Sequence, residues 1–207
     1  MKTLHGLYAI TDPQLSPGLV VIEHVRQALL GGAKVIQYRD KTSPFEQQLT
    51  IAKQLKTLCD QHQAWLIIND SIELAKQSQA HGLHIGKDDA ALAQARQQLG
   101  EQAIIGVSCY NDLSRAQQMQ NLGANYVAFG RFFPSQTKPH APQADITTLQ
   151  QAKQTLHIPV VAIGGINKTN APDLVQAGAH SLAVIQGVFA QADIRQAAAD
   201  ISALFKV

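Results

Sequence analysis

The feature that most constrains the fold is a regular alternation of two kinds of segment along the 207 residues. Short runs of β-branched and other apolar residues, bounded by Gly, Asn or Asp, are typical of strands buried in a parallel sheet. Longer stretches rich in Ala, Gln, Leu and Lys separate these runs, and such residues are good helix formers. The sequence therefore predicts a series of strand–helix units.

Eight units can be recognised. The predicted strands are Leu7–Ile10, Val35–Tyr38, Trp65–Ile68, Gly82–Ile85, Ile104–Ser108, Tyr126–Phe129, Pro159–Ile163 and Ser181–Ile185. The predicted helices are Val20–Leu30, Pro44–His62, Ile72–Gln79, Ala90–Leu99, Leu113–Leu122, Ile146–Leu156, Asn170–Ala177 and Ile194–Phe205. This order predicts an α/β protein with the (β/α)8 TIM barrel fold, as a single domain over residues 1–207. A doubly wound open sheet is the alternative, but regular units without a break favour closure.

Composition excludes several classes of protein. With 45% hydrophobic residues the chain can bury a sizeable core, which argues against disorder. The 17 Lys and Arg nearly balance the 15 Asp and Glu, and no basic run occurs, so we expect neither nucleic-acid nor membrane-surface binding. No apolar stretch approaches the roughly 18 residues of a membrane span. The N-terminus lacks the apolar core of a signal peptide. These features predict a soluble, cytoplasmic protein.

Cysteine and histidine patterns predict no disulfide and no zinc site. Cys59 and Cys109 are too few for a disulfide framework, and Cys59 is expected to be an inert buried thiol. His81 and His84 lie three residues apart, and on an extended strand positions three apart face opposite sides. We therefore predict no zinc site here, although His84 can face the barrel interior.

A first cluster of functional polar residues follows the second predicted strand, in Gln37-Tyr38-Arg39-Asp40-Lys41. Because successive residues of a strand alternate faces, Gln37, Arg39 and Lys41 point to the same side. In TIM barrels the carboxyl ends of the strands carry the chemistry. An arginine fork, a lysine charge and an amide suit a ligand that bears phosphate. The alternative is a solvated ion pair at the rim, for example between Arg39 and Asp40.

Acidic residues follow the next two predicted strands, as Asn69-Asp70 and Asp88-Asp89. Carboxylates from neighbouring loops can bind one Mg²⁺ ion that also contacts a substrate phosphate. The alternative is that each pair caps the helix that follows it, which is a common role of Asn and Asp. The basic cluster one strand earlier favours the magnesium site.

Later strand ends add further candidates. Ser108 can donate a hydrogen bond to a phosphate or cap the next helix, and we expect no base beside it that would make it a nucleophile. The long segment 130–140 contains hydroxyls, a lysine and prolines, and is typical of a lid over an anionic ligand. Gly164-Gly165 and Gln186-Gly187 follow strands seven and eight, where backbone N–H groups often bind phosphate. The alternative for these glycines is a turn required by packing.

The ordered set of motifs is more specific than any one of them. It consists of Leu7-Tyr8-Ala9-Ile10-Thr11-Asp12, Ile36-Gln37-Tyr38-Arg39-Asp40-Lys41, Ile67-Ile68-Asn69-Asp70, Gly82-Leu83-His84-Ile85-Gly86-Lys87-Asp88-Asp89, Ile105-Gly106-Val107-Ser108, Gly123-Ala124-Asn125-Tyr126, Pro134-Ser135-Gln136-Thr137-Lys138 and Ile163-Gly164-Gly165-Ile166. Together these motifs resemble the thiamine-phosphate synthase family of (β/α)8 barrels. The resemblance covers nearly the whole chain.

The resemblance implies a transferase that joins hydroxymethylpyrimidine pyrophosphate to hydroxyethylthiazole phosphate, through a dissociative step that releases pyrophosphate. It implies Mg²⁺ as cofactor, with Asp70 and Asp89 as ligands. The residues that it implies as catalytic are Arg39, Lys41, Ser108 and Lys138. Those that it implies as substrate contacts are Gln37, Tyr38, Arg39, Asp40, Lys41, Asn69, Ser108, Ser135, Gln136, Thr137, Lys138, Gly165, Ile185 and Gln186. The outer helices leave room for a homodimer.

Three positions depart from the family pattern. Arg131 follows Gly130 where the family often has Gly-Pro, Gln186 stands where Ser is common, and Asp88 replaces a frequent Glu. Three other functions compete with the synthase. A related thiazole tautomerase tends to use a His after strand six, where this chain has Arg131. A phosphosugar isomerase would need an evident acid–base pair. A barrel that only senses a phosphate ligand would have no need of the carboxylates and lysine.

Overall fold

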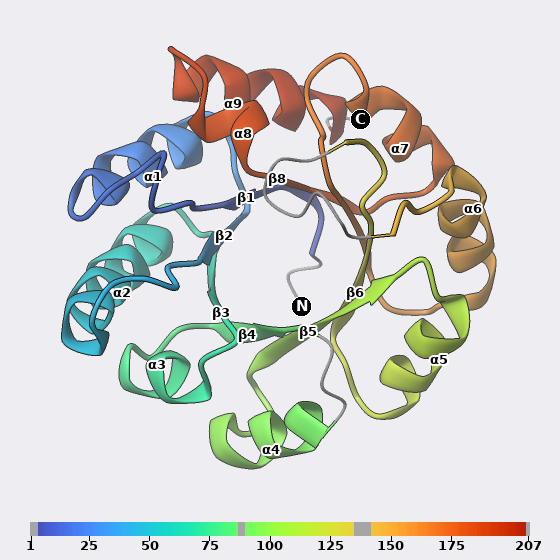
Figure 1. The fold of residues 1–207 in the computed structure, drawn as a ribbon, viewed down its shortest axis with the longest axis horizontal. Coiled ribbons are helices and arrows are strands. Elements are labelled where there is room, and N and C mark those ends of the chain that lie inside the picture. Colours follow the sequence, from blue (N-terminus) through green and yellow to red (C-terminus); the bar gives the residue numbers. More distant parts are fainter. Residues whose placement is uncertain (1–3, 87–89, 135–141, 206–207) are drawn as a thin grey trace.

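The computed structural model describes residues 4–86, 90–134 and 142–205. Eight parallel strands, β1 to β8, form a closed barrel in chain order, and β8 pairs with β1. Helices surround the barrel, as Figure 1 shows in a view through its centre. The prediction of a (β/α)8 TIM barrel is therefore confirmed. None of the described helices combines the length and apolarity needed to cross a bilayer.

The strands are short and the helices that follow them vary in length. The strands are β1 Gly6–Ile10, β2 Val35–Tyr38, β3 Trp65–Asn69, β4 Gly82–Ile85, β5 Ile104–Tyr110, β6 Tyr126–Phe129, β7 Val160–Ile163 and β8 Ser181–Val184. The helices are α1 Val20–Leu30, α2 Phe45–Gln61, α3 Ile72–Gln77, α4 Ala90–Leu99, α5 Leu113–Asn121, α6 Ile146–Thr155, α7 Ala171–Ala177, α8 Gln186–Phe189 and α9 Ile194–Ser202, with the 3₁₀ turn η1 Ala203–Phe205.

Two hydrophobic cores lie on either side of the barrel wall. On β1, Leu7 and Ala9 pack outward in the large core between the strands and the helices. The alternate residues, Tyr8 and Ile10, belong to a smaller core inside the barrel. Strands buried on both faces are apolar almost throughout, which is why their sequences show no polar alternation. A polar residue on the inner face is therefore an exception that calls for an explanation.

The structure differs most from the predicted elements after Ser108 and after β8, while the ends of β3 and β8 differ by one residue. β5 continues past Ser108 to Tyr110, and its register against β6 shifts between these residues. Tyr110 itself has a positive φ of 56°. After β8 a four-residue helix, α8, precedes α9, and the sequence analysis did not predict it. A segment of that length is too short to show a helical period, so only the tertiary structure reveals it.

Candidate active site

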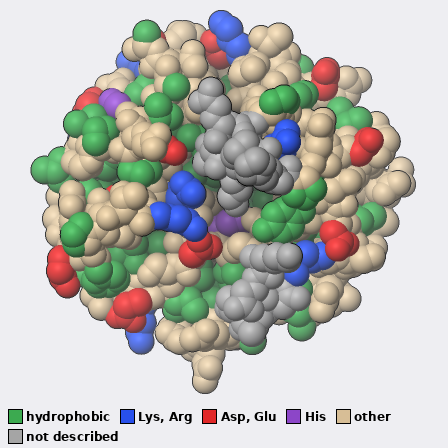
Figure 2. Space-filling view, viewed as in Figure 1, with side chains coloured by type: hydrophobic (Ala, Val, Ile, Leu, Met, Phe, Trp, Pro, Cys, Tyr) green, Lys and Arg blue, Asp and Glu red, His purple; other side chains and the backbone are tan. Residues whose placement is uncertain are grey.

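A cavity of about 760 Å³ lies at the carboxyl ends of the strands. Each strand contributes an inward-facing residue to its lining: Tyr8, Gln37, Asn69, His84, Ser108, Tyr126, Val161 and Ala183. In Figure 2, basic and acidic side chains surround a histidine near the centre of this face. The position agrees with the rule that TIM barrels place their active sites at this end.

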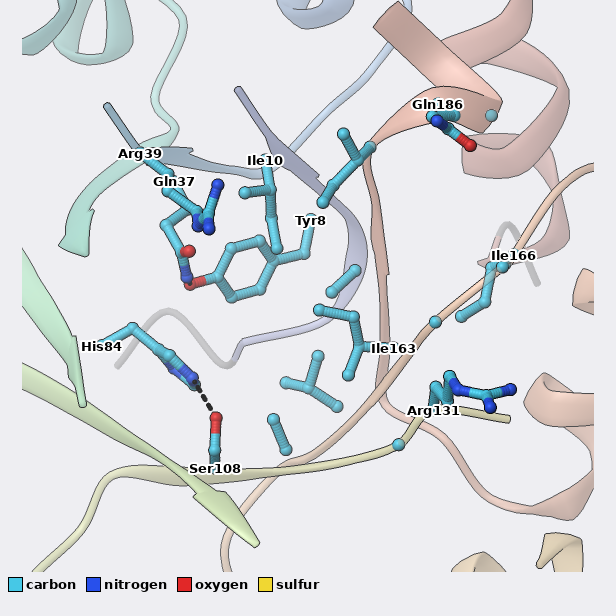
Figure 3. A pocket seen from close by; sticks show the side chains of 18 of the residues that line it. Tyr8, Ile10, Gln37, Arg39, His84, Ser108, Arg131, Ile163, Ile166 and Gln186 are labelled. Atoms are coloured by element: carbon cyan, nitrogen blue, oxygen red, sulfur yellow. Dashed lines mark hydrogen bonds between the residues drawn. The ribbon is translucent and has the colours of Figure 1, made fainter. Parts of the chain in front are cut away.

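The predicted basic cluster faces this cavity. Gln37, Arg39 and Lys41 all line it, so the alternation that the sequence predicts for these three residues is confirmed. Figure 3 shows Gln37 and Arg39 on one side of the cavity and Arg131 and Gln186 on the opposite side. The cavity thus carries cationic or amide groups on two facing walls.

Tyr38 and Asp40 do not line the cavity, although the resemblance implies both as substrate contacts. The strand alternation turns Tyr38 outward into the core beneath the helices, where it is 3% exposed. Burial, and then the nearby charge of Asp40, raise the pKa of the Tyr38 phenol well above its usual value. The Asp40 carboxylate instead accepts hydrogen bonds from the backbone N–H groups of Thr42 and Ser43, at 2.9 and 3.0 Å.

These hydrogen bonds determine the charge state of Asp40. Partial burial opposes its ionisation, but the bonds from Thr42 and Ser43 outweigh burial and hold the pKa of Asp40 below its usual value. Asp40 is therefore bound within its own turn and makes no ion pair with Arg39 among the described contacts. The alternative of a rim ion pair between these two residues is wrong.

Asp70 lies at the cavity mouth in an unusual backbone conformation. Its φ is 61°, in the left-handed region, where a residue other than glycine is strained and often functional. Its Oδ2 accepts a hydrogen bond from Asn69 Nδ2 at 2.8 Å and lies 3.0 Å from Lys41 Nζ. Ser71, and not Asp70, caps α3, because its hydroxyl accepts from the backbone of Leu74. The capping alternative for Asn69-Asp70 is therefore wrong.

Ser108 has a basic neighbour that the sequence analysis did not expect. His84 Nε2 lies 2.9 Å from Ser108 Oγ, and the other ring nitrogen lies 3.0 Å from the hydroxyl of Tyr126 (Figure 3 shows the bond to Ser108). The sequence analysis did not expect a histidine beside Ser108, and it lies there because β4 and β5 are neighbours in the barrel. Ser108 does not cap α5 either, since Asp112 does so.

Three inward-facing polar residues were not identified as site residues from the sequence: Tyr8, His84 and Tyr126. The tyrosines are fully buried inside the barrel, at 1% and 0% exposure. A buried tyrosine hydroxyl must find a hydrogen-bond partner, so a tyrosine at an inward position of a barrel strand was the available signal. The sequence analysis allowed an inward orientation only for His84, and that orientation is confirmed.

The opposite wall is formed by the ends of β7 and β8. Gly165, Ile185 and Gln186 line the cavity there. A Cβ at Gly165 would lie 2.3 Å from the carbonyl oxygen of Pro134, so glycine is required where the segment after β6 approaches. Packing therefore explains the glycine at position 165, which was the alternative to phosphate binding. Gly165 nevertheless lines the cavity.

Several predicted residues lie outside the described part of the chain. They are Asp88, Asp89, Ser135, Gln136, Thr137 and Lys138. Within residues 4–86, 90–134 and 142–205, no group of three or more His, Cys, Asp or Glu side chains could hold a metal ion. Arg131, at the position that departs from the family pattern, lines the cavity.

Fold and site together indicate a (β/α)8-barrel enzyme whose cavity holds a basic cluster beside Asp70, a carboxylate on a left-handed backbone. The family model for thiamine monophosphate synthase matches residues 7–188. A thiamine-phosphate synthase of Alcanivorax borkumensis is 51% identical, over 100% of this chain and 96% of the relative. One of Nitrosococcus oceani is 49% identical, over 96% and 91%. The chain belongs to the thiamine monophosphate synthase family.

A solved structure supports the same assignment. It is described as thiamine phosphate pyrophosphorylase from Pyrococcus furiosus, with a TM-score of 0.89 and 33% sequence identity. The match covers 98% of this chain and 96% of that one. The barrel fold is therefore shared over essentially the full length of both proteins.

Proposed function

We propose that this chain is a transferase that condenses hydroxymethylpyrimidine pyrophosphate with hydroxyethylthiazole phosphate, forming thiamine phosphate and pyrophosphate. The observation that carries the proposal is the placement of Gln37, Arg39 and Lys41 on the same cavity as Asp70 and Ser108. Full-length relatives at 51% and 49% identity support it. The substrates and the roles of individual residues are parts of the proposal.

Arg39 and Lys41 bind the pyrophosphate in this proposal. Lys41 contacts Asp70 at 3.0 Å, but about half of each side chain is exposed, at 57% and 47%. Exposed ion pairs contribute only about 0–1 kcal/mol, so Lys41 can exchange this contact for a phosphate oxygen at little cost. Arg39 adds a planar fork of donors that suits two phosphate oxygens. Fixed positive charge then stabilises the pyrophosphate as its negative charge increases.

Asp70 fits the role of a Mg²⁺ ligand. Its carboxylate lies at the cavity mouth, and one oxygen lies 3.7 Å from where a Cβ at Gly86 would stand. The chain leaving β4 therefore passes Asp70 and leads to Asp89 three residues later. Two carboxylates with phosphate oxygens form the oxygen ligand set that Mg²⁺ prefers. When bound, the ion neutralises charge on the pyrophosphate.

The thiazole phosphate occupies the opposite wall in this proposal. Gly165, Ile185 and Gln186 line the cavity where β7 and β8 end and α8 begins. Loops at these positions bind phosphate in many TIM barrels, through backbone N–H groups. A contact through the backbone tolerates Gln186 where serine is common. Ser135, Gln136 and Thr137, which lie outside the described residues, supply the remaining contacts in this proposal, as the resemblance implies.

The reaction itself requires no protein nucleophile. The bond between the pyrimidine methylene carbon and the pyrophosphate oxygen breaks, and its electron pair leaves with pyrophosphate. The lone pair of the thiazole nitrogen then forms the new carbon–nitrogen bond. Holding both substrates in one cavity makes their encounter effectively intramolecular. In this scheme Ser108 acts as a hydrogen-bond donor and Lys138 as a further positive charge.

The competing functions have less support. The Ser108–His84 contact resembles part of a hydrolase site, but His84 Nδ1 contacts the hydroxyl of Tyr126 and not a carboxylate. A thiazole tautomerase would use a histidine after strand six, where Arg131 lines the cavity. Neither a phosphosugar isomerase nor a non-catalytic sensor would require Arg39, Lys41 and Asp70 in this arrangement.

The decisive experiment measures pyrophosphate release from the purified protein with both substrates, with and without Mg²⁺. We expect release that requires the thiazole phosphate and that stops when the metal is chelated. No release, together with retained binding of thiazole phosphate, would favour the tautomerase or the sensor. Cell fractionation and sedimentation analysis would test two further parts of the proposal, a cytoplasmic location and a homodimer.

A further inference from the structure

A chain of four hydrogen bonds crosses the inside of the barrel at the bottom of the cavity. Gln37 Nε2 donates to Tyr8 Oη at 2.8 Å, and Tyr8 Oη lies 2.8 Å from Tyr126 Oη. Tyr126 Oη lies 3.0 Å from His84 Nδ1, and His84 Nε2 lies 2.9 Å from Ser108 Oγ. The five side chains come from β2, β1, β6, β4 and β5. Figure 3 shows Gln37, Tyr8, His84 and Ser108 around the cavity.

Packing holds the middle of this chain in place. The rings of Tyr8 and Tyr126 meet edge to face with centroids 6.0 Å apart, and His84 stacks on Tyr126 at 5.6 Å. On the neighbouring strand Gly106 leaves the space that the Tyr126 ring fills, because a Cβ there would lie 1.9 Å from the ring. The hydrogen-bonded atoms are therefore positioned by the barrel wall before any ligand binds.

Counting hydrogens gives the chain a direction. Burial raises the pKa of Tyr8 and of Tyr126 far above the usual value, so both phenols keep their proton. Tyr8 accepts a hydrogen bond from Gln37, so its own proton serves the contact with Tyr126. Tyr126 then donates to Nδ1 of His84, which leaves the ring proton on Nε2. His84 Nε2–H then donates to Ser108 Oγ, so the Ser108 hydroxyl proton is left for a further acceptor such as a ligand.

The direction fixes what the cavity offers at its two ends. With its amide nitrogen bonded to Tyr8, Gln37 presents its Oε1 as an acceptor, while Ser108 presents a donor. If every hydrogen bond ran in the opposite direction, Gln37 would present a donor and Ser108 an acceptor. Each side chain can donate or accept, but a reversal at one bond requires a reversal at all the others. A ligand held between Gln37 and Ser108 must therefore match both ends at once.

We propose that Tyr8, Tyr126 and His84 are positioning residues that couple Gln37 to Ser108 and so select a pyrimidine with an exocyclic amino group over its oxo counterpart. The inference rests on the proposed function for the identity of the substrate. An amino group donates to Gln37 Oε1, whereas an oxo group in its place directs a second acceptor at the same oxygen. Buried polar groups left unmatched in this way are a strong basis for rejecting an analogue.

The first test determines the direction of the hydrogen-bond chain and needs no activity assay. In protein labelled with ¹⁵N-histidine, we expect the His84 signal of a neutral ring that carries its proton on Nε2. The Tyr126→Phe variant keeps the ring against Gly106 but removes the hydroxyl between Tyr8 and His84, so this signal should shift. A proton on Nδ1 of His84 in the unaltered protein would overturn the proposal, whether or not the protein is a synthase.

The second test measures kcat/KM for the aminopyrimidine pyrophosphate and for its oxo analogue. In Tyr126→Phe the preference for the amino substrate should fall about tenfold, as expected for losing one neutral hydrogen bond. The KM for thiazole phosphate and the Mg²⁺ dependence should not change. Ser181→Ala is the matched control, since it removes a buried hydroxyl on β8 that does not line the cavity.

An unchanged preference in a folded Tyr126→Phe variant would contradict the proposal. If that variant does not fold, Tyr8→Phe breaks the chain one bond earlier and should lower the same preference. Failure of the unaltered protein to turn over either pyrimidine would instead count against the proposed function, and the histidine signal would still report the direction of the chain.

Discussion

Gly106 on β5 lies directly beside Tyr126 on β6, so that a Cβ at position 106 would stand 1.9 Å from Cζ of the tyrosine ring. The ring is fully buried, and it also packs against the rings of Tyr8 and His84. This relationship links a glycine of the barrel wall to the hydrogen-bond chain beneath the cavity.

Gly106→Ala is therefore expected to displace Tyr126 and to destabilise the protein by about 1–3 kcal/mol, the usual cost of overpacking a core. For a chain of this size each kcal/mol lowers Tm by about 2–4 °C. Thermal unfolding measures the loss, and the preference between amino and oxo substrates should fall with it. A Tm within one degree of the original would show that the wall adapts more easily than this contact indicates.

Asp70→Asn should raise the Mg²⁺ concentration for half-maximal activity by at least about tenfold, because even indirect changes around a metal cost that much. Asparagine tolerates the left-handed backbone, so the fold should persist. The exposed contact with Lys41 contributes little stability, and Tm should hardly change. Asp60→Asn is the control, because it also removes a lysine partner, Lys56, but lies away from the cavity. Equal metal titrations in both variants would remove Asp70 from the metal site.

Arg39→Lys keeps the positive charge and loses the planar fork. We expect kcat/KM for the pyrimidine pyrophosphate to fall about 10- to 100-fold, the worth of one hydrogen bond to a charged group. The KM for thiazole phosphate should remain the same, since that substrate is proposed to bind the opposite wall. Steady-state kinetics with each substrate varied in turn measures both values. If only the kinetics with thiazole phosphate were impaired, Arg39 would be assigned to the thiazole phosphate and not to the pyrophosphate.

His180 makes stability depend on pH. Its Nδ1 accepts a hydrogen bond from the backbone N–H of Val160, at 3.2 Å. Burial first, and then the charges of His5 and Lys153, lower the pKa of His180 from its ordinary value of 6.5. Below pH 6.5 the unfolded chain binds a proton that the folded protein resists, so stability falls with pH until the folded pKa is passed.

His180→Asn should reduce this dependence. An asparagine at the equivalent place before β6, Asn125, already accepts from the N–H of Ile105 at 2.8 Å without titrating. We expect the Tm of His180→Asn to vary less between pH 7 and pH 5 than that of the original protein. His157→Asn, at an exposed histidine, provides the comparison. Parallel Tm curves for the original protein and His180→Asn would exclude His180 as the source.

Both cysteines should be unreactive in the native protein. Cys59 and Cys109 are fully buried, and burial, followed by the charge of Asp60, raises the pKa of the Cys59 thiol to about 12. A thiol reagent at pH 8 should therefore label neither cysteine until the protein unfolds, when both react. Rapid labelling of one thiol in the folded protein would contradict the burial described here.

Local patterns predicted most of the fold because each strand and helix carries its own signal. The common orientation of Gln37, Arg39 and Lys41 followed from strand alternation alone. The same alternation turns Tyr38 away from the cavity. The substrate contact that the family resemblance implies for Tyr38 therefore contradicts the strand pattern. The four residues of α8 gave no periodic signal, since a single turn buries no recognisable stripe.

The sequence by itself predicted the barrel from the order of its strand–helix units, and the common face of Gln37, Arg39 and Lys41 from strand alternation, because both signals lie within single segments. Only the tertiary structure decided that Tyr8, Tyr126 and His84 join Gln37 to Ser108. Those contacts link strands up to 118 residues apart. The physical reason is barrel closure, which brings alternate residues of separate strands to one interior, and no local pattern records which of them will meet.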